Sequence, residues 1–257
     1  MVEQTDNLVF QVEHWLNRLY IATEGAGLRV EDRRKAIEVA AMLGEIGRAA
    51  GRLSRRSTLV LVDAAAGKSY VGLLAAKLIF QPMQRRAEVV TIELDPRRVD
   101  LSCRAAKLLE TKIFVECRAG SVEDPDVWPS RPAVVTALHA CGPAADAIID
   151  NAIKCEARSL LLVPCCTSRA VAAAGRAIKK AELLGFPTQA AVRRRFIQSW
   201  VDAERTLRLE AAGYETEVVE LVGATVTPHN LLWRSRRVCE PVRMAAARRR
   251  LQSFSES

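Results

Sequence analysis

The chain opens with two stretches in which apolar residues recur every three or four positions. The first covers residues 7–24 and brings Trp15, Leu19 and Tyr20 to one face, and the second covers residues 30–53. This spacing is typical of helices that bury one side against a core. Glycines separate the two stretches, so we predict two helices ahead of the rest of the fold.

From residue 58 the pattern changes to short runs that are apolar at almost every position. Runs of this kind suit parallel strands whose two faces are both buried. The predicted strands are residues 58–62, 88–92, 112–116, 133–138 and 159–163, and the predicted helices are residues 69–80, 96–109, 144–153 and 169–184. This alternation predicts a mostly parallel sheet with helices on both faces.

A longer helical pattern over residues 190–212 precedes two closing strand-like runs, 215–222 and 230–236. With these two strands as a hairpin at one edge, the predicted fold is a doubly wound α/β domain. It has a mostly parallel seven-stranded sheet, a C-terminal antiparallel hairpin and an N-terminal helical extension. We assign the extension to residues 1–56, the main domain to residues 57–238 and a basic tail, helical or frayed, to residues 239–257.

The overall charge is strongly basic. The formal net charge of +8 attracts phosphates and other polyanions, although such a surplus also occurs in proteins that bind no nucleic acid. No apolar run approaches the roughly 20 residues that span a bilayer. The N-terminal residues do not form a basic segment followed by an apolar stretch, so we expect a cytoplasmic protein without a membrane partner.

The seven cysteines are scattered and form no CxxC pair, which argues against a structural zinc site. We therefore expect no bound metal. Free thiols fit a reducing compartment.

A loop of small residues follows the first predicted strand. Asp63 ends the strand, Ala65 and Gly67 allow a ligand to approach the backbone, and Ser69 begins a helix. A phosphate-binding P-loop would need a glycine where this chain has Val62. We favour an S-adenosylmethionine (SAM)-binding loop of the form Asp-x-Gly-x-Gly, with Ala65 at the first glycine; an ordinary tight turn is the alternative.

Acidic and small residues also follow the next two predicted strands. Glu93 stands where a carboxylate accepts hydrogen bonds from ribose hydroxyls in dinucleotide-binding folds, and an ordinary surface acid is the alternative. Asp95 before Pro96 is typical of a helix start, which gives it a structural role. After the third strand, Gly120 and Ser121 are candidates to face an adenine amino group.

The fourth and fifth strands end in residues capable of proton or thiol chemistry. His139 is a candidate base or substrate-positioning residue, with a structural histidine as the alternative. Cys165 and Cys166 precede a predicted helix, where thiol pKa values fall, and simple packing is the alternative. A metal site formed by these residues with Cys141 is a less favoured interpretation.

Several segments in order resemble one family. They are Asp63-Ala-Ala-Ala-Gly67-Lys-Ser-Tyr70-Val-Gly72, Thr136-Ala-Leu-His-Ala-Cys-Gly142 with Ala145-Asp146, Leu162-Val-Pro-Cys-Cys166, Arg205–Tyr214 and Thr227–Asn230. Over about residues 57–237 they are similar to the methyltransferase domain of methyltransferase-like protein twenty-five and its bacterial relatives. The departure is Ala65, where that family has glycine.

The resemblance implies a Rossmann-like methyltransferase fold with SAM as the methyl donor. By position it implies that the cofactor contacts Asp63, Ala65, Gly67 and Glu93 and that the reaction takes place near His139 and Pro164–Cys166. With the strand-end residues, the expected cofactor site also includes Ser69, Gly120, Ser121 and His139, and the expected catalytic residues are His139, Cys165 and Cys166. We expect methyl transfer to a nucleophile near His139, which accepts a proton if the acceptor is a hydroxyl or an amine.

The sequence leaves the methyl acceptor open. A related group of tRNA 2′-O-methyltransferases also carries paired cysteines late in the domain, and with the basic charge this similarity favours RNA. Candidate RNA contacts are Arg193, Arg194 and Arg195, with Arg248, Arg249 and Arg250 in the tail. One alternative is a small-molecule or peptide methyltransferase with the N-terminal helices as a lid; another is a non-catalytic binding protein.

Overall fold

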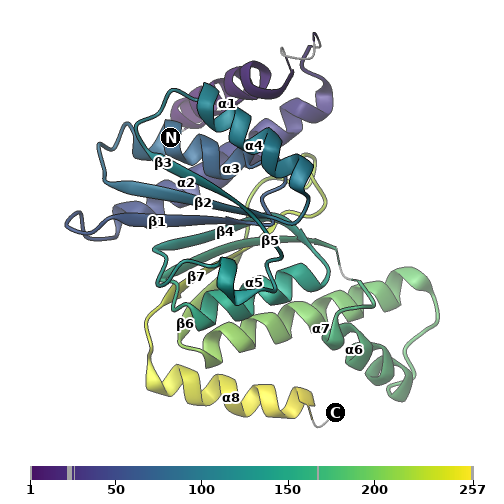
Figure 1. The fold of residues 1–257 in the computed structure, drawn as a ribbon. Helices are drawn as coiled ribbons and strands as arrows, with labels where there is room; N and C mark the ends of the chain where they lie inside the picture. The colour runs from purple at the N-terminus through teal and green to yellow at the C-terminus, as the bar shows by residue number, and fades with distance from the viewer. Residues whose placement is uncertain (1, 22–24, 26, 167, 256–257) are drawn as a thin grey trace.

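The computed structural model describes residues 2–21, 25, 27–166 and 168–255. Seven strands form one sheet in the order β3-β2-β1-β4-β5-β7-β6 (Figure 1). The strands are β1 (Leu59–Ala64), β2 (Ala87–Glu93), β3 (Phe114–Ala119), β4 (Val134–Cys141), β5 (Ser159–Cys166), β6 (Tyr214–Glu220) and β7 (Leu231–Arg237). The helices of the main domain are α3 (Tyr70–Leu74) continued by η3 (Ala75–Phe80), α4 (Pro96–Leu108), the short η4 (Pro125–Val127), α5 (Pro143–Lys154), α6 (Ala172–Leu183) and α7 (Ala190–Ala211).

The first five strands pair in parallel, and β7 pairs antiparallel with both β5 and β6. The predicted fold class, including the C-terminal hairpin, is confirmed. The chain starts in the middle of the sheet and moves outward to β3 before it returns to β4 beside β1. Ligands of such sheets bind at this reversal of strand order, beyond the carboxyl ends of the strands.

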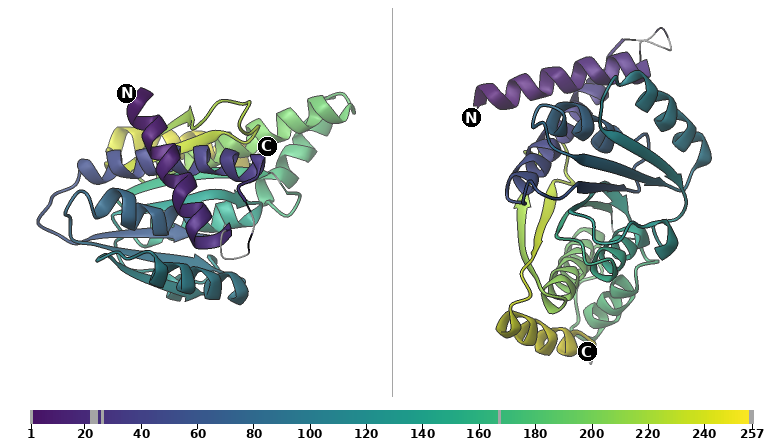
Figure 2. Two further views of the ribbon diagram at one scale, coloured as in Figure 1. Left: turned by 90° about the horizontal axis from the view of Figure 1, so that it is seen from above. Right: turned by 60° about the vertical axis from the view of Figure 1, so that its left-hand side comes forward.

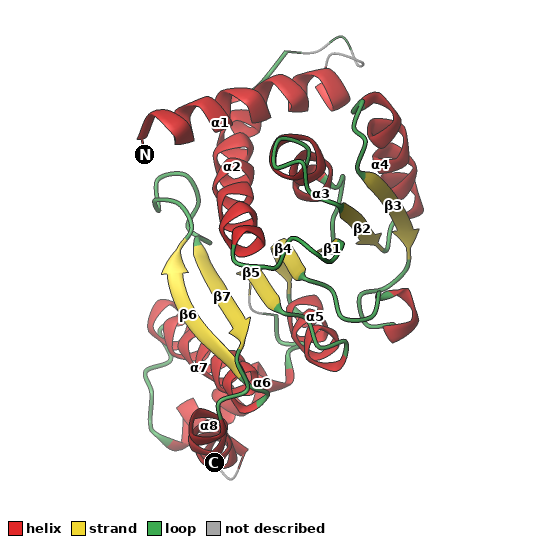
Figure 3. Cartoon of the chain, turned by 90° about the vertical axis from the view of Figure 1, so that its left-hand side faces the viewer, coloured by secondary structure: helices red, strands yellow, loops and turns green. Residues whose placement is uncertain are grey.

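Alternating side chains of the buried strands serve two separate cores. Leu61 in β1 and Leu161 in β5 pack on the side of the N-terminal helices, whereas Val62 and Leu162 pack on the side of α5. Successive side chains of a strand point to opposite faces, so an apolar residue is needed at every position. The sheet therefore lies between two helical layers, α1 to α4 on one side and α5 to α8 on the other (Figures 1 and 3).

The N-terminal residues form α1 (Val2–Leu16), the π-helical turn η1 (Asn17–Ile21) and α2 (Val30–Gly51). Residues 22–24 of the first predicted helix lie outside the described residues. The helix α2 lies against the sheet and α1 crosses over it (Figure 2). Trp15, Leu19 and Tyr20 are all buried in the core that α2 shares with β1 and β5, so these two helices are packed into the domain core.

The basic tail forms the helix α8 (Pro241–Ser255), which packs beneath α7 (Figure 1). The rings of Trp200 in α7 and Phe254 in α8 lie 4.5 Å apart, and Ala247 is fully covered. The sequence left open whether the tail is helical or frayed, and in the structure it is helical. No helix in the described part of the chain combines the length and apolar character that crossing a membrane requires.

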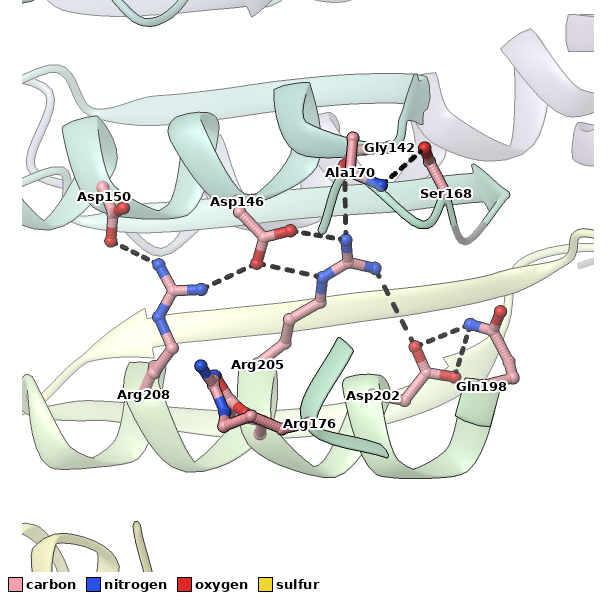
Figure 4. A network of polar contacts seen from close by, with 11 residues as sticks. Gly142, Asp146, Asp150, Ser168, Ala170, Arg176, Gln198, Asp202, Arg205 and Arg208 are labelled. Atoms are coloured by element: carbon pink, nitrogen blue, oxygen red, sulfur yellow. Dashed lines mark hydrogen bonds and ion pairs between the residues drawn. The ribbon is translucent and has the colours of Figure 1, made fainter. Parts of the chain in front are cut away.

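A buried arginine joins α7 to the end of β4 (Figure 4). Arg205 is 1% exposed, donates to Asp146 in α5 at 2.8 Å and contacts the carbonyl oxygen of Gly142 at 3.4 Å. Arg208 donates to Asp146 as well and pairs with Asp150. A buried charge is tolerated only when it is paired in this way. The network therefore fixes the position of Gly142, the residue that follows β4.

Candidate active site

The carboxyl ends of β1, β2 and β4 meet at one edge of the sheet. In the strand register Asp63 of β1 lies beside Thr91 of β2 and Thr136 of β4, and Glu93 lies beside Ala119 of β3. The two acidic residues singled out from the sequence therefore end neighbouring strands.

Asp63 is buried and takes part in the local backbone structure. Its Oδ2 atom accepts a hydrogen bond of 2.8 Å from the backbone N–H of Gly72 in α3. Burial raises the pKa of the carboxyl group, the Gly72 hydrogen bond lowers it, and the charge of Glu93 raises it, so that the pKa is about 7. A buried carboxyl that titrates near neutral pH becomes more acidic when a cationic group approaches.

Glu93 closes the loop after β1. One carboxylate oxygen accepts from the backbone N–H of Gly67 at 2.7 Å, and the other accepts from the N–H of Asp95 at 3.0 Å. A carboxylate has about four acceptor positions, so Glu93 retains capacity for two further hydroxyl donors. Asp95 itself caps α4 by accepting from the N–H of Arg97, which confirms its predicted structural role.

The loop from Ala64 to Ser69 takes unusual backbone angles. Ala65, Gly67 and Ser69 have φ values of 52°, 60° and 57°, in the left-handed region that favours glycine. The side-chain oxygen of Ser69 is buried without a hydrogen-bond partner, and the space in front of Gly67, where a Cβ atom would stand, is open. The Tyr20 hydroxyl donates to the carbonyl oxygen of Lys68 at 2.7 Å, so η1 holds this loop from outside.

Gly120 and Ser121 lie at the end of β3. The N–H of Gly120 donates to the carbonyl oxygen of Glu93 at 2.9 Å. A Cβ atom on Gly120 would lie 2.7 Å from Val127, so only glycine fits there. The hydroxyl of Ser121 accepts from the N–H of Glu123 at 3.2 Å, a turn contact that the sequence analysis did not anticipate.

His139 contacts a residue that the sequence analysis missed. Its Nε2 atom lies 2.7 Å from a carboxylate oxygen of Glu38 in α2, and the two side chains are 22% and 6% exposed. The pairing of β4 with β5 is irregular at this point, and His139 has a φ of 66°. Such an irregularity re-aims a strand side chain, here toward α2. The signal in the sequence was an acidic residue among the apolar positions of the second predicted helix.

The ionised carboxylate of Glu38 determines that Nε2 of His139 carries a hydrogen in their contact. Burial alone would raise the pKa of Glu38, but hydrogen bonds from His139 and Lys35 outweigh it and lower that pKa. An ionised carboxylate only accepts, so Nε2 of His139 carries a hydrogen in this contact, and in a neutral ring the lone pair then lies on Nδ1. This arrangement leaves Nδ1 as the atom able to take a proton.

The cysteines lie beside His139. Cys141 and Cys165 form a disulfide between the ends of β4 and β5, so the expectation of free thiols is wrong for this pair. In the disulfide form Cys165 has no thiolate, and its catalytic role stays a prediction for the reduced protein. The side chain of Cys166 lies outside the described part of the structure. No group of three or more His, Cys, Asp or Glu residues suited to a metal occurs among the described residues.

The three candidate arginines of α7 divide between two settings. Arg193 pairs with Glu182 at 2.9 Å. Arg194 and Arg195 line a cavity of about 250 Å³ with Pro164 and Cys165 at the end of β5. Two of the three candidate RNA contacts in α7 therefore lie at the same edge of the sheet as His139.

Comparison with known proteins relates this chain to methyltransferases. The family model of a methyltransferase domain matches residues 34–172, more than half of the chain. No curated protein matches the chain. The match begins inside α2, so it includes Glu38 as well as the strand ends.

Solved structures of methyltransferases share the fold. Magnesium protoporphyrin IX methyltransferase from Synechocystis PCC 6803 with bound SAH (S-adenosylhomocysteine) is 14% identical and has a TM-score of 0.51; the match covers 92% of this chain and 99% of that one. A Podospora anserina methyltransferase with bound SAH is 11% identical, with a TM-score of 0.52 and coverage of 90% and 88%. The C-methyltransferase domain of the citrinin polyketide synthase is 11% identical, with a TM-score of 0.52 and coverage of 82% and 54%.

The backbone of Ala65 predicts a stabilising substitution. We expect Ala65→Gly to raise the free energy of unfolding by about 1 kcal/mol, because a left-handed φ is unfavourable for any residue with a Cβ atom. Urea denaturation measures the change. The control is Ala66→Gly at the neighbouring position, which lacks a positive φ and should lose stability; equal losses in both variants would contradict the prediction.

The buried carboxyl of Asp63 predicts a pH-dependent stability difference. Because its pKa is raised from 3.8 to about 7, the folded protein binds more protons than the unfolded chain between these values, and stability falls as pH rises through them. Asp63→Asn removes this titration while it still offers Gly72 an acceptor. The unfolding free energy of the variant relative to wild type should rise by about 2 kcal/mol between about pH 5 and about pH 7; a constant difference would refute the assignment.

Proposed function

The chain belongs to the methyltransferase-domain family, and from this premise we propose that it transfers a methyl group from SAM to a nucleophile held near His139. SAM carries its methyl group on a sulfonium, which makes the methyl carbon electrophilic. The contribution of the protein is then chiefly the alignment of donor and acceptor. We also propose that the protein is located in the cytoplasm.

The main observation behind the proposal is the hydrogen bond that joins the loop after β1 to the end of β2, from the N–H of Gly67 to the carboxylate of Glu93. Glu93 holds Gly67 and keeps unused acceptor positions, and the space in front of Gly67 is open. The buried, unpartnered hydroxyl of Ser69 and the carboxyl of Asp63 lie in the same loop region. These groups suit a ligand with ribose hydroxyls and a positive charge, so SAM fits the residues present. Gly120 and Ser121 would border the adenine.

His139 has the geometry of a base for this reaction. Its Nε2–H is held by the Glu38 carboxylate, which fixes the ring and leaves Nδ1 to accept the proton of a hydroxyl or amine acceptor. The carboxylate also stabilises the charge that His139 gains when it takes this proton. In the reduced protein, Cys165 and Cys166 would stand at the acceptor side of the same edge.

The segments quoted in the sequence analysis support a narrower relationship, to methyltransferase-like protein twenty-five and its bacterial relatives. In this chain the segments from Thr136 to Gly142 and from Leu162 to Cys166 form the ends of β4 and β5. Within this proposal, residues 1–56 form a cap on the methyltransferase domain of residues 57–238, and residues 239–257 form the basic tail.

For the acceptor we propose RNA. Arg194 and Arg195 line the cavity at the end of β5, and the whole chain has a net charge of +8. Guanidinium groups bind phosphate in a bidentate geometry. An RNA strand that passes this cavity would bring a nucleotide to the edge of the sheet where His139 lies.

A small-molecule or peptide acceptor is the second candidate, because the N-terminal helices border a cavity near the cofactor loop. The cavity is about 260 Å³ and is lined by Leu19, Tyr20 and Lys68 with four side chains of α4. Four of its seven lining residues are apolar, and Tyr20, Lys68 and Arg104 are the polar ones, a mixture that suits a compact ligand.

Cofactor binding tests the proposal most simply. We expect wild-type protein to bind SAM and SAH with micromolar affinity, a binding free energy of about −8 kcal/mol. Glu93→Ala should weaken binding by about 100-fold, because it removes charge-assisted hydrogen bonds to the ribose and releases Gly67. Isothermal calorimetry measures both.

The matched control is Glu88→Ala, an exposed glutamate at the start of the same strand, which should bind SAH like wild type. Folded wild-type protein that binds neither SAM nor SAH would overturn the proposed activity and leave a binding protein that retains only the fold.

A further inference from the structure

A third cavity, of about 540 Å³, opens away from the candidate active site. It lies between the C-terminal half of α2, the first residues of β5 and the strand β7. Six arginines line it: Arg48, Arg52, Arg158, Arg234, Arg236 and Arg237. Glu45 is the one carboxylate among its lining residues in the described part of the chain, so the cavity is strongly basic.

Glu45 builds the floor of this cavity. It accepts two hydrogen bonds from Arg234, at 2.6 and 2.9 Å, and another from Arg48. Burial would raise the pKa of Glu45, but these arginines outweigh it and lower that pKa. The side chain of Arg234 is thereby fixed in place, as a pre-organised binding group must be.

Two of the arginines are not neutralised. Glu217 pairs with Arg234, Glu215 with Arg236 and Glu156 with Arg237. Arg52 and Arg158 are exposed, and neither has a carboxylate within ion-pair distance among the described residues. Arg52 acts on Glu215 only beyond ion-pair distance, so the guanidinium groups of Arg52 and Arg158 can attract an anion with more than one charge.

The residues that line the cavity indicate which kind of anion it would bind. Guanidinium forks match the geometry of phosphate oxygens, and the volume exceeds that of a single phosphate. None of the described residues that line the cavity is aromatic, so they offer no surface on which a base stacks. These features suit the backbone of a nucleic acid, bound without regard to its sequence.

We propose that this cavity, the arginine cavity, binds the phosphate backbone of a single-stranded RNA substrate at a distance from the reacting nucleotide. The proposal rests on RNA as the acceptor. Ser159 lines the arginine cavity and Cys165 lines the cavity beside Arg194 and Arg195. Six residues of strand separate them along β5, roughly 20 Å, and the two cavities lie on opposite faces of the sheet, one bordered by α2 and the other by α7. A substrate must therefore be several nucleotides long to reach both.

Salt-dependent RNA binding tests this assignment. The probe is labelled poly(uridylic acid), followed by fluorescence anisotropy over a range of salt concentrations. Arg52→Ala combined with Arg158→Ala should weaken binding and reduce the slope of log K against log salt by about 1.4, since each phosphate contact on a single strand contributes about 0.7. The control pair, Arg86→Ala with Lys107→Ala, removes two exposed cations near the opposite edge of the sheet and should keep the wild-type slope.

Three results would overturn the arginine cavity as an RNA site. They are a wild-type slope in the Arg52/Arg158 variant, an equal loss in the control variant, and displacement of the strand by inorganic phosphate as effectively as by unlabelled polymer at equal phosphorus concentration. SAH calorimetry on the same samples separates this proposal from the proposed activity. If wild-type protein binds RNA through these arginines but not SAH, only the methyltransferase activity fails; if it binds SAH but not RNA, only the arginine cavity and the RNA acceptor fail.

Discussion

Two carboxylates on the buried side of α2 must each be matched by a hydrogen-bond donor on the sheet. Glu38 and Glu45 are seven residues apart, about two helical turns, so they share one face of the helix. Glu38 meets His139 of β4 and Glu45 meets Arg234 of β7. An unpaired carboxylate at either position would cost several kcal/mol. Apolar contacts have no direction, so these two pairs favour one position of α2 on the sheet.

This constraint joins the N-terminal helices to the chemistry. The first half of α2 holds the imidazole of His139 at the irregular end of β4 through Glu38. The π-helical turn η1, which precedes α2 in the chain, holds the proposed cofactor loop through Tyr20. The other end of α2 supplies Glu45, Arg48 and Arg52 to the arginine cavity. A helix that looks like an accessory element in sequence thus borders both regions in which ligands are proposed to bind. The family match, which begins at residue 34, is consistent with this integration.

The local elements could be predicted because their causes are local. Fully apolar runs identified β1 and β5, and Asp95 before Pro96 identified the start of α4. The ends of β4 and β5 extend further than predicted, to Cys141 and Cys166, because small and polar residues there carry no apolar pattern. The positions of Asp63 and Glu93 followed from strand ends meeting at one edge.

The contacts that complete the site could not be predicted in this way. Glu38 and His139 are 101 residues apart in the chain, and Glu45 and Arg234 are 189 apart. Nothing local distinguishes these acids from the exposed ones on the same helix. Likewise, the disulfide between Cys141 and Cys165 depends on β4 and β5 being neighbours, and the six arginines of the arginine cavity come from three separate segments.

The central claim is that Glu38 and His139 interact directly and hold α2 to the end of the sheet where the active site is proposed. A double-mutant cycle with Glu38→Gln and His139→Asn measures this interaction from unfolding free energies; asparagine suits the positive φ at position 139. We predict a favourable coupling of about 0.5–3 kcal/mol at neutral pH. Because the pKa of Glu38 is lowered in the folded protein, the coupling should fade as pH falls below the ordinary glutamate value of about 4.3. Strict additivity at neutral pH would contradict the account.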